Sequence, residues 1–244
     1  MARGYPDYNN PLYNIAARNL DLSSALLAMR GIQSVDGLGR MVYATTFADG
    51  LNDWKQYASG AAPVWYASGV EPEIAPVCAS TTTAPPTYAS VAMWHHNALS
   101  DYTGIGVQLS VQHAANLAQL QVEIQLWSSD GVYIRENLYK LLVRPANSDI
   151  QYKNSHTSYT TVASLDRMTG YTHWNTIKMV IDPATQTFVR LRVNNQTYAP
   201  NIQDNSALVI PPAIVLLGIT AITPDSTARS QSVGHVLITY DEPI

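Results

Sequence analysis

Acidic side chains are the first candidates for chemistry, because hydrolysis of a glycosidic bond needs two carboxylates that face each other across it. Glu123 stands alone between Gln121 and Gln125. Asp241 and Glu242 are adjacent, and adjacent residues of a strand project to opposite faces of the sheet. No Glu-x-Asp-x-(x)-Glu spacing occurs in the chain. The sequence therefore favours a protein that is not an enzyme, with a glycanase of rearranged carboxylates as the weaker alternative.

Histidine and cysteine also lack the spacing of a catalytic or metal site. His95 and His96 are adjacent, so on a strand one imidazole faces the core and the other faces solvent unless the strand bulges. Cys78 is the only cysteine, which excludes an intrachain disulfide and a cysteine-based zinc site. No phosphate-binding glycine loop or nucleophile elbow is present. We expect no catalytic residue, no metal and no cofactor; calcium is compatible with the acidic loops, but nothing in the sequence supports it.

The composition limits the partners of the chain. Of its 244 residues only 13% are charged, about half of the roughly 25% typical of soluble domains. The net charge is -4 and basic residues do not cluster, which argues against nucleic acid as a partner. No stretch is long and apolar enough to span a membrane. A weakly charged polar surface suits a protein packed against neighbours, and equally an extracellular β domain.

From Met41 onward, short β-branched and aromatic stretches alternate with Gly, Pro, Asn and Asp, as in an all-β sandwich or barrel. In residues 120–127, Leu, Val, Ile and Leu alternate with Gln, Glu, Gln and Trp, so one face of this strand is predicted to face the core. Two polar or Pro-rich stretches, 71–86 and 143–158, are predicted to be loops, and Cys78 lies in the first.

Residues 1–40 differ from the rest, and we assign them to an arm that precedes a domain at 41–244. Asp21 is a suitable N-cap and Gly31 a suitable C-terminal stop, which predicts a short helix at about 21–31. The helix either covers an open end of its own sheet or, with the arm, lies on a neighbouring subunit. The residues predicted to make assembly contacts are Tyr5, Tyr8, Pro11, Leu12, Tyr13, Leu22, Leu26 and Met29.

Three stretches resemble concanavalin A-like (laminin G-like) jelly rolls. TTFADGLNDWKQYASG resembles their first strand and turn, and THWNTIKMVIDPATQTFVRLRVNNQTY resembles their central hairpin. VGHVLITYDE resembles the closing strand, which lies near the first one. The resemblance covers about residues 41–242 and implies an antiparallel jelly-roll sandwich. It does not select a function, because the fold hosts lectins, glycanases, laminin G modules and virion proteins.

A narrower resemblance concerns the arm and the first strand together. The stretch LYNIAARNLDLSSALLAMRGIQSVDGLGRMVYATTFADGLNDW resembles bacteriophage virion proteins of uncharacterised function, with Phe47, Asp49, Gly50, Leu51 and Trp54 matching. Where those proteins have a further acidic residue, this chain has Ala48. The resemblance implies a structural protein that decorates or cements a phage particle, assembled in the host cytoplasm. Its partners would be other virion proteins and copies of itself, held by multivalent contacts.

The alternative is a carbohydrate-binding module used for host attachment, because sugar sites combine an aromatic platform with hydrogen-bonding side chains. The candidate platforms are Trp65, Tyr66, Trp94, Trp127, Tyr133 and Trp174. From these we select Trp65, Tyr66 and Trp127. The first strand is expected to place Phe47 inward, to turn at Asp49 and Gly50, and to pack Trp54 beneath Phe47.

Overall fold

The computed structural model describes residues 39–47, 50–59, 65–69, 78–83, 90–98, 104–113, 117–129, 134–154, 158–164, 173–203, 214–222 and 228–244. In this part of the chain the regular structure is all strand apart from one 3-10 turn, η1 (Pro145–Asn147). The strands are β1 (Arg40–Thr45), β2 (Lys55–Ser59), β3 (Tyr66–Ser68), β4 (Cys78–Thr83), β5 (Ser90–Ala98), β6 (Ile105–His113), β7 (Gln119–Ser129), β8 (Ile134–Arg144), β9 (Asp149–Asn154), β10 (Ser158–Ser164), β11 (His173–Asp182), β12 (Thr187–Val193), β13 (Gln196–Tyr198), β14 (Ile202–Gln203), β15 (Ile214–Ile222) and β16 (Arg229–Tyr240).

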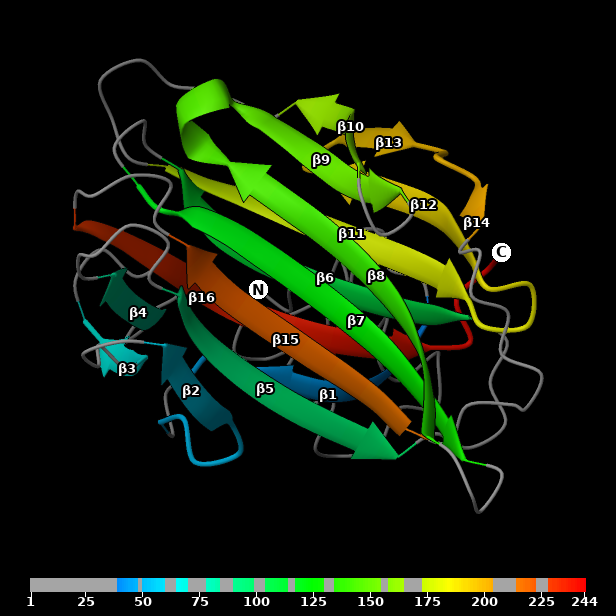
Figure 1. The fold of residues 1–244 in the computed structure, drawn as a ribbon, viewed down its shortest axis with the longest axis horizontal. Coiled ribbons are helices and arrows are strands. Elements are labelled where there is room, and N and C mark those ends of the chain that lie inside the picture. The colour runs from blue at the N-terminus through cyan, green and yellow to red at the C-terminus, as the bar shows by residue number, and fades with distance from the viewer. Residues whose placement is uncertain are drawn as a thin grey trace, which may run out of the picture.

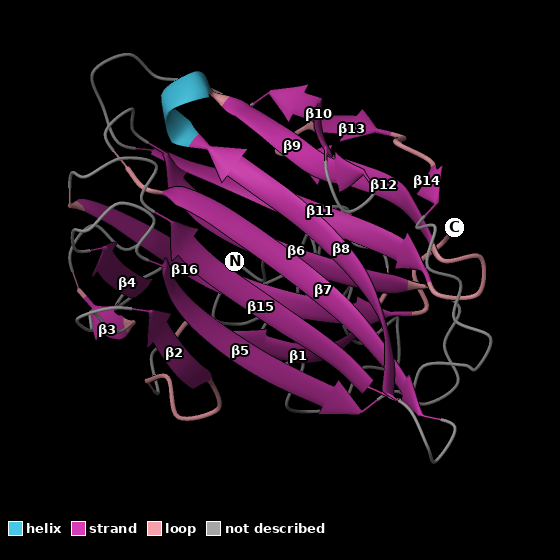
Figure 2. Cartoon of the chain, viewed as in Figure 1, coloured by secondary structure: helices cyan, strands magenta, loops and turns pink. Residues whose placement is uncertain are grey.

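The strands form two antiparallel sheets that pack face to face (Figures 1 and 2). The nine-stranded sheet has the order β13-β12-β11-β6-β16-β4-β3, with β1 also paired to β16 and β14 to β12. The seven-stranded sheet has the order β10-β9-β8-β7-β15-β5-β2 and faces the viewer in Figure 1. The closing strand β16 pairs with the first strand β1. The predicted jelly-roll sandwich is therefore confirmed.

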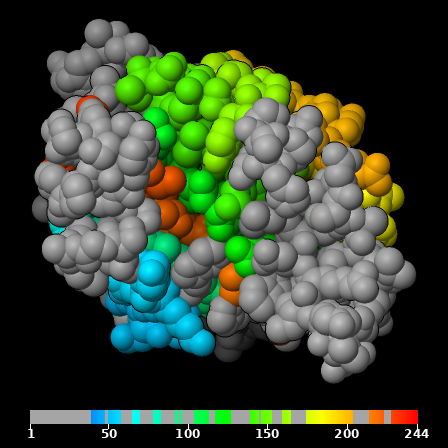
Figure 3. Space-filling view, viewed as in Figure 1, coloured from blue at the N-terminus to red at the C-terminus, as the bar shows by residue number. Residues whose placement is uncertain are grey.

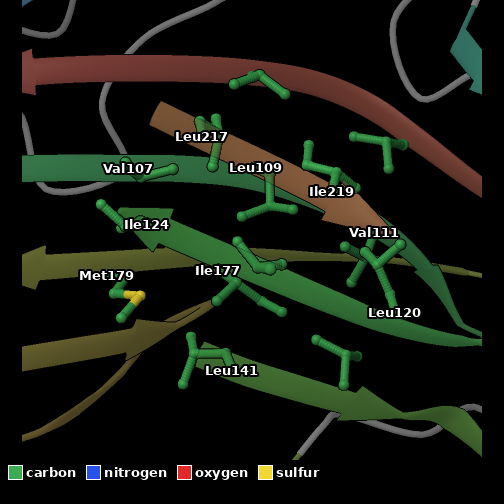
Figure 4. Close-up of a cluster of buried hydrophobic side chains, with 14 of the residues drawn as sticks. Val107, Leu109, Val111, Leu120, Ile124, Leu141, Ile177, Met179, Leu217 and Ile219 are labelled. Atoms are coloured by element: carbon green, nitrogen blue, oxygen red, sulfur yellow. The ribbon is translucent and has the colours of Figure 1, made fainter. Parts of the chain in front are cut away.

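The core lies between the two sheets and follows from the alternation of the strands. In β7 the side chains of Leu120, Val122, Ile124 and Leu126 are fully buried, as the sequence pattern predicts. They meet residues of β6 and β11 from the other sheet, which Figure 4 shows as interleaved aliphatic side chains. Burial of this apolar surface is the main stabilising contribution to the sandwich.

The corner after β1 places Phe47, Gly50 and Trp54 as the sequence predicts, and Asp49 lies outside the described residues. Phe47 is fully buried with φ of 63°, and Gly50 N donates to Phe47 O at 3.0 Å to close the turn. Trp54 packs against Phe47 with ring centroids 6.0 Å apart. The Trp54 indole N–H also donates to the Tyr43 hydroxyl at 3.0 Å. The turn therefore joins β1 to the core through two aromatic rings.

Both stretches that the sequence predicts to be loops contain strands. Within 71–86, residues 78–83 form β4, which pairs with β16 and β3. Within 143–158, η1 is followed by β9, which pairs with β8 and β10. Both segments are polar, but each pairs on both sides in its sheet, and tertiary pairing overrides weak local propensity. Cys78 consequently lies buried at the start of β4 and not in an irregular loop.

The chain segment after β16 returns over the nine-stranded sheet and holds a buried charge. The Glu242 carboxylate accepts from Lys178 Nζ at 2.7 Å and from Arg190 Nη2 at 3.0 Å. It also accepts a hydrogen bond from the Thr239 hydroxyl. A Cβ added to Gly106 would collide with the Thr239 and Glu242 side chains. Glycine in β6 therefore leaves the space that this carboxylate occupies.

The assembly residues predicted in the arm, from Tyr5 to Met29, lie outside the described residues, as do the predicted helix and most of the predicted arm. The described domain begins at Gly39, one residue before β1. Among the described residues, no helix has the length and apolar character needed to cross a membrane.

Candidate functional site

The outer face of the seven-stranded sheet carries a row of residues in register across all seven strands. Side chains directly opposite one another on paired strands share a face. Neighbouring strands lie about 4.8 Å apart, so the seven positions extend over about 29 Å. Figure 3 looks onto this face, where green atoms of β7 and β8 lie near orange atoms of β15. The row contains Tyr57, Ala92, Thr220, Gln121, Leu142, Gln151 and Thr161.

The centre of this face is an amide cluster, which we define as Gln121, Glu123, Gln125 and Lys140. Glu123 is 5% exposed and accepts from Lys140 Nζ at 2.5 Å. The Gln121 amide donates to Glu123 Oε1, and Gln125 Nε2 donates to Oε2 at 3.4 Å. The carboxylate is thus neutralised by the lysine, and it fixes an amide on each side of it along β7. Amides held in one orientation offer both a donor and an acceptor at defined positions.

Beside the amide cluster the sheet carries a position without a side chain. Gly218 of β15 stands in register between Glu123 of β7 and Trp94 of β5. Lys140 continues this second row on β8, and Lys55 of β2 is opposite Trp94. Gly218 and the amide cluster are therefore neighbours on this face, and the glycine leaves β15 without a side chain beside Glu123.

The edges of the face differ in character. Tyr57, on the edge strand β2, is 68% exposed and stands in the row that contains Gln121. Near the opposite edge, Arg144 forms an ion pair with Asp149, with Arg144 Nε donating to Asp149 Oδ1 at 2.7 Å. This hydrogen bond raises the pKa of Arg144 above its usual value. The face thus has an aromatic side chain at one edge and a neutralised ion pair near the other.

The glycan platforms selected from the sequence do not converge on this face. Trp65 is 1% exposed and belongs to the core, so its ring offers no surface to a sugar, and the platform prediction is wrong for this residue. Tyr66 is exposed but lies on β3 at the edge of the nine-stranded sheet. Trp127 lies on β7 opposite Glu136 and Ile214, and its side chain is outside the described part. Tyr66 and Trp127 stay predictions.

His95, one of the two adjacent histidines considered for chemistry, occupies a structural position. His95 packs into the sandwich, with its ring stacked on that of Tyr43 at 3.8 Å between centroids. His95 and Trp54 surround the Tyr43 ring, and burial raises the pKa of the Tyr43 phenol to about 12. Within the described residues, no group of three or more His, Cys, Asp or Glu is placed to hold a metal ion. The side-chain bonds that the described part gives to Glu123 come from amides and a lysine.

Three residues of this face were not predicted from the sequence. Tyr57 lies in a short strand, and nothing in its local sequence separates an exposed edge tyrosine from a buried one. Lys140 and Gly218 lie far from Glu123 in the chain, and their proximity depends on the registers of β8 and β15 against β7. The alternation of Gln121, Glu123 and Gln125 was a usable signal, because it places three polar side chains on one face.

Comparison with known proteins supports the fold. No protein-family model matches the sequence, and no curated protein matches it. The structure resembles that of a carbohydrate esterase from the Shiga toxin-encoding bacteriophage phi24B, with TM-score 0.52, 14% identity, and coverage of 84% of this chain and 100% of the other.

Two further structures are similar. The cellulose induced protein Cip1 has TM-score 0.52 and 9% identity, with 81% of this chain and 97% of the other covered. The potassium-bound carbohydrate recognition domain of Emp46p has TM-score 0.50 and 11% identity, with 82% and 94% covered. At such low identity the likeness shows the fold alone. The chain therefore has the concanavalin A-like β-sandwich fold that its three sequence stretches predict.

Proposed function

We propose that this protein is a carbohydrate-binding module whose binding surface is the outer face of the seven-stranded sheet. The observation that carries the proposal is the amide cluster, in which Glu123 fixes Gln121 and Gln125 next to Gly218. Sugar hydroxyls both donate and accept hydrogen bonds, and an amide side chain offers them both a donor and an acceptor. The structural likeness to the Emp46p carbohydrate recognition domain is compatible with this assignment.

The rigidity of the amide cluster favours binding over a purely structural role. A side chain that is already ordered loses little conformational entropy when a ligand binds, which improves affinity. Lys140 neutralises Glu123, so the cluster carries no uncompensated charge that a sugar would have to desolvate. Tyr57 adds an exposed ring in the neighbouring row, where the apolar face of a sugar can stack.

A glycan array followed by calorimetry on two matched tyrosine variants tests the proposal. Tyr57 and Tyr66 are both exposed and both lie on short edge strands, but in different sheets. We expect Tyr57→Ala to weaken glycan binding by about tenfold, corresponding to about 1.4 kcal/mol, and Tyr66→Ala to leave it unchanged. The reverse result would move the site to the nine-stranded sheet, and failure of the wild-type protein to bind any glycan would refute the proposal.

We propose further that the module acts without catalysis. The side-chain donors to Glu123 in the described part are Gln121, Gln125 and Lys140, which does not provide the facing carboxylate that glycoside hydrolysis needs. The similar phage protein is a carbohydrate esterase, so the test includes both activities. Absence of turnover on polysaccharides and on acetylated sugars is expected. Turnover that is lost in Glu123→Gln would restore the glycanase alternative.

A second candidate function is a structural component of a phage particle, which the edge strand β10 favours. Its residues 158–164 carry no charge, and Tyr159, Thr160, Thr161 and Ser164 are exposed or nearly so. Charged side chains on an edge strand normally prevent pairing with another chain. This edge is therefore suited to lateral contacts with other copies or other virion proteins. Thr161→Lys is expected to weaken the part of any self-association that β10 contributes, measured by light scattering, and unchanged association would exclude β10 as a contact.

A further inference from the structure

We propose that the ligand of this face is an uncharged oligosaccharide that crosses the strands from Tyr57 towards the amide cluster. This inference rests on the proposed carbohydrate-binding function and specifies its ligand class. It starts from the charged side chains that the structure describes on this face, four of which form two pairs. Glu123 is paired with Lys140, and Arg144 is paired with Asp149.

The pairing works against acidic sugars. To hold a uronate or a sulfate, the face would have to release Lys140 from Glu123 or Arg144 from Asp149. Glu123 is almost fully buried and Lys140 is largely so, and separating a buried pair leaves an uncompensated charge at a high cost in free energy. The hydrogen-bonding groups that need no such separation are the uncharged ones, Gln121 and Gln151 among them.

Lys55 is the exception that the test must include. It is exposed on the edge strand β2, in register with Trp94. An exposed lysine is screened by salt and attracts an anion only weakly. If acidic sugars were the ligands, Lys55 would be, among the described side chains of this face, the cation outside these two pairs that could hold an acidic sugar.

The geometry also indicates a ligand longer than one sugar. Tyr57 and Gln121 are separated by three strand-to-strand steps through Ala92 and Thr220, which is about 14 Å at about 4.8 Å per step. The side chains at the two intervening positions are small and buried, so they add little to the contact surface between Tyr57 and the amide cluster. Contact with Tyr57 and with the amide cluster at the same time therefore requires several linked rings.

The test compares polysaccharides that share a backbone and differ in the carboxylate, namely polygalacturonate with its carboxyl-reduced form and polymannuronate with β-1,4-mannan. Dissociation constants are measured by calorimetry at about 25 mM and about 500 mM NaCl. We expect the neutral member of a pair to bind at least about tenfold more tightly, with little change between the two salt concentrations. We also expect a hexasaccharide of that polymer to bind more tightly than its disaccharide.

The variants separate the possible failures. Gln121→Ala and Tyr57→Ala should each weaken neutral binding, whereas Lys55→Gln and the exposed Gln203→Ala on the other sheet should not. Binding of the acidic polysaccharide that weakens with salt and is lost in Lys55→Gln would overturn this inference. Equal affinity for the acidic and the neutral polysaccharide of a pair would overturn it too. Both outcomes would leave the proposed carbohydrate-binding function in place. Neutral binding that ignores Gln121 and Tyr57 would overturn the placement, and a protein that binds no glycan would refute both proposals.

Discussion

Glu242 is held by interactions that its neighbour in sequence does not have. Its carboxylate has no exposed surface and is bonded by Lys178, Arg190 and Thr239. Asp241 pairs with Arg40 at 3.1 Å, but both side chains of that pair are about half exposed. At the residue scale, these two adjacent carboxylates allow a buried ion pair to be compared directly with a surface one.

Replacing Glu242 should destabilise the domain much more than replacing Asp241. Glu242→Ala leaves Lys178 buried without its carboxylate, and the expected loss in unfolding free energy is about 3–5 kcal/mol. Asp241→Ala removes an exposed pair and should cost about 0–1 kcal/mol. Urea denaturation of the two variants measures both values. Equal losses would mean that the Glu242 cluster contributes nothing beyond a surface salt bridge.

The buried phenol of Tyr43 makes stability depend on alkaline pH. Burial raises its pKa from 10.0 to about 12, so the folded protein holds this proton more tightly than the unfolded chain does. The stabilising effect is complete below pH 10 and is lost as the pH rises from 10 to about 12. Burial also raises the pKa of Tyr240 to about 12, over the same range.

Unfolding free energies measured across this range should therefore fall, and they should fall less steeply in Tyr43→Phe. The variant also loses the hydrogen bond from Trp54, so its stability at neutral pH is expected to be lower while its slope is smaller. Tyr57→Phe, with its ring exposed, is the matched control and should keep the wild-type slope. A slope unchanged in Tyr43→Phe would show that this phenol does not contribute.

At the scale of the elements, β1 and β6 each depend on a local feature to fit the sandwich. The turn after β1 places Phe47 and Trp54 together in the core. In β6, Gly106 lies opposite Thr239 of β16 and beneath the Glu242 carboxylate. The first feature fills space between the sheets, and the second leaves space free on the outer side of one sheet.

Removal of the Trp54 ring should open a cavity under the β1 turn. We expect Trp54→Ala to lower the unfolding free energy by about 3–5 kcal/mol, because the ring contacts Phe47, Tyr43 and His95. The control is Tyr57→Ala on β2, whose ring is exposed and whose loss should cost no more than about 0.5 kcal/mol. A wild-type melting temperature for Trp54→Ala would contradict the placement of this ring.

A methyl group on Gly106 should force the Glu242 cluster apart. Gly106→Ala brings Cβ into collision with Thr239 and Glu242, and overpacking of this kind costs about 1–3 kcal/mol. The same substitution in a Glu242→Ala background should cost less, because one of the two colliding side chains is gone. Additive losses in thermal unfolding would show that Gly106 and Glu242 do not interact.

For the whole molecule, the question is whether the described sandwich folds and binds without the segment before it. The core residues come from both sheets within the described part, so the domain has a complete core of its own. The predicted assembly residues of the arm precede this domain, and they concern the contacts between molecules. Folding and assembly are thus expected to be separable.

A chain that starts at Gly39 should remain folded and should differ from the full chain in its association. We expect light scattering at equal concentration to give the mass of an oligomer for the full chain and of a monomer for the shorter chain. The reason is that the arm supplies Tyr5, Tyr8 and Tyr13 for contacts between copies. Far-UV circular dichroism of the shorter chain checks that its strands are intact. If each chain has the mass of its own monomer, self-assembly through the arm is excluded.

The sequence alone determined the fold class and, for many residues, which face of their strand is buried in the core. Alternation in 120–127 separates the core face of β7 from its polar face, and the turn chemistry around Gly50 predicts the Phe47 and Trp54 corner. These predictions succeed because period and turn residues act over a few positions. The sequence also predicted that β16 would lie beside β1, through the resemblance of its closing stretch.

The tertiary structure alone decided what the polar face of β7 contains. Gly218 and Lys140 reach Glu123 through strand registers, and a register depends on how two whole strands pair, which no local pattern specifies. Trp65 and Tyr57 are both aromatic. The packing of the sandwich buries Trp65 in the core, whereas Tyr57 is exposed on an edge strand. The alternation of polar and apolar residues predicts which side chains share a face of one strand. Only the pairing of the strands decides which side chains of different strands come into contact.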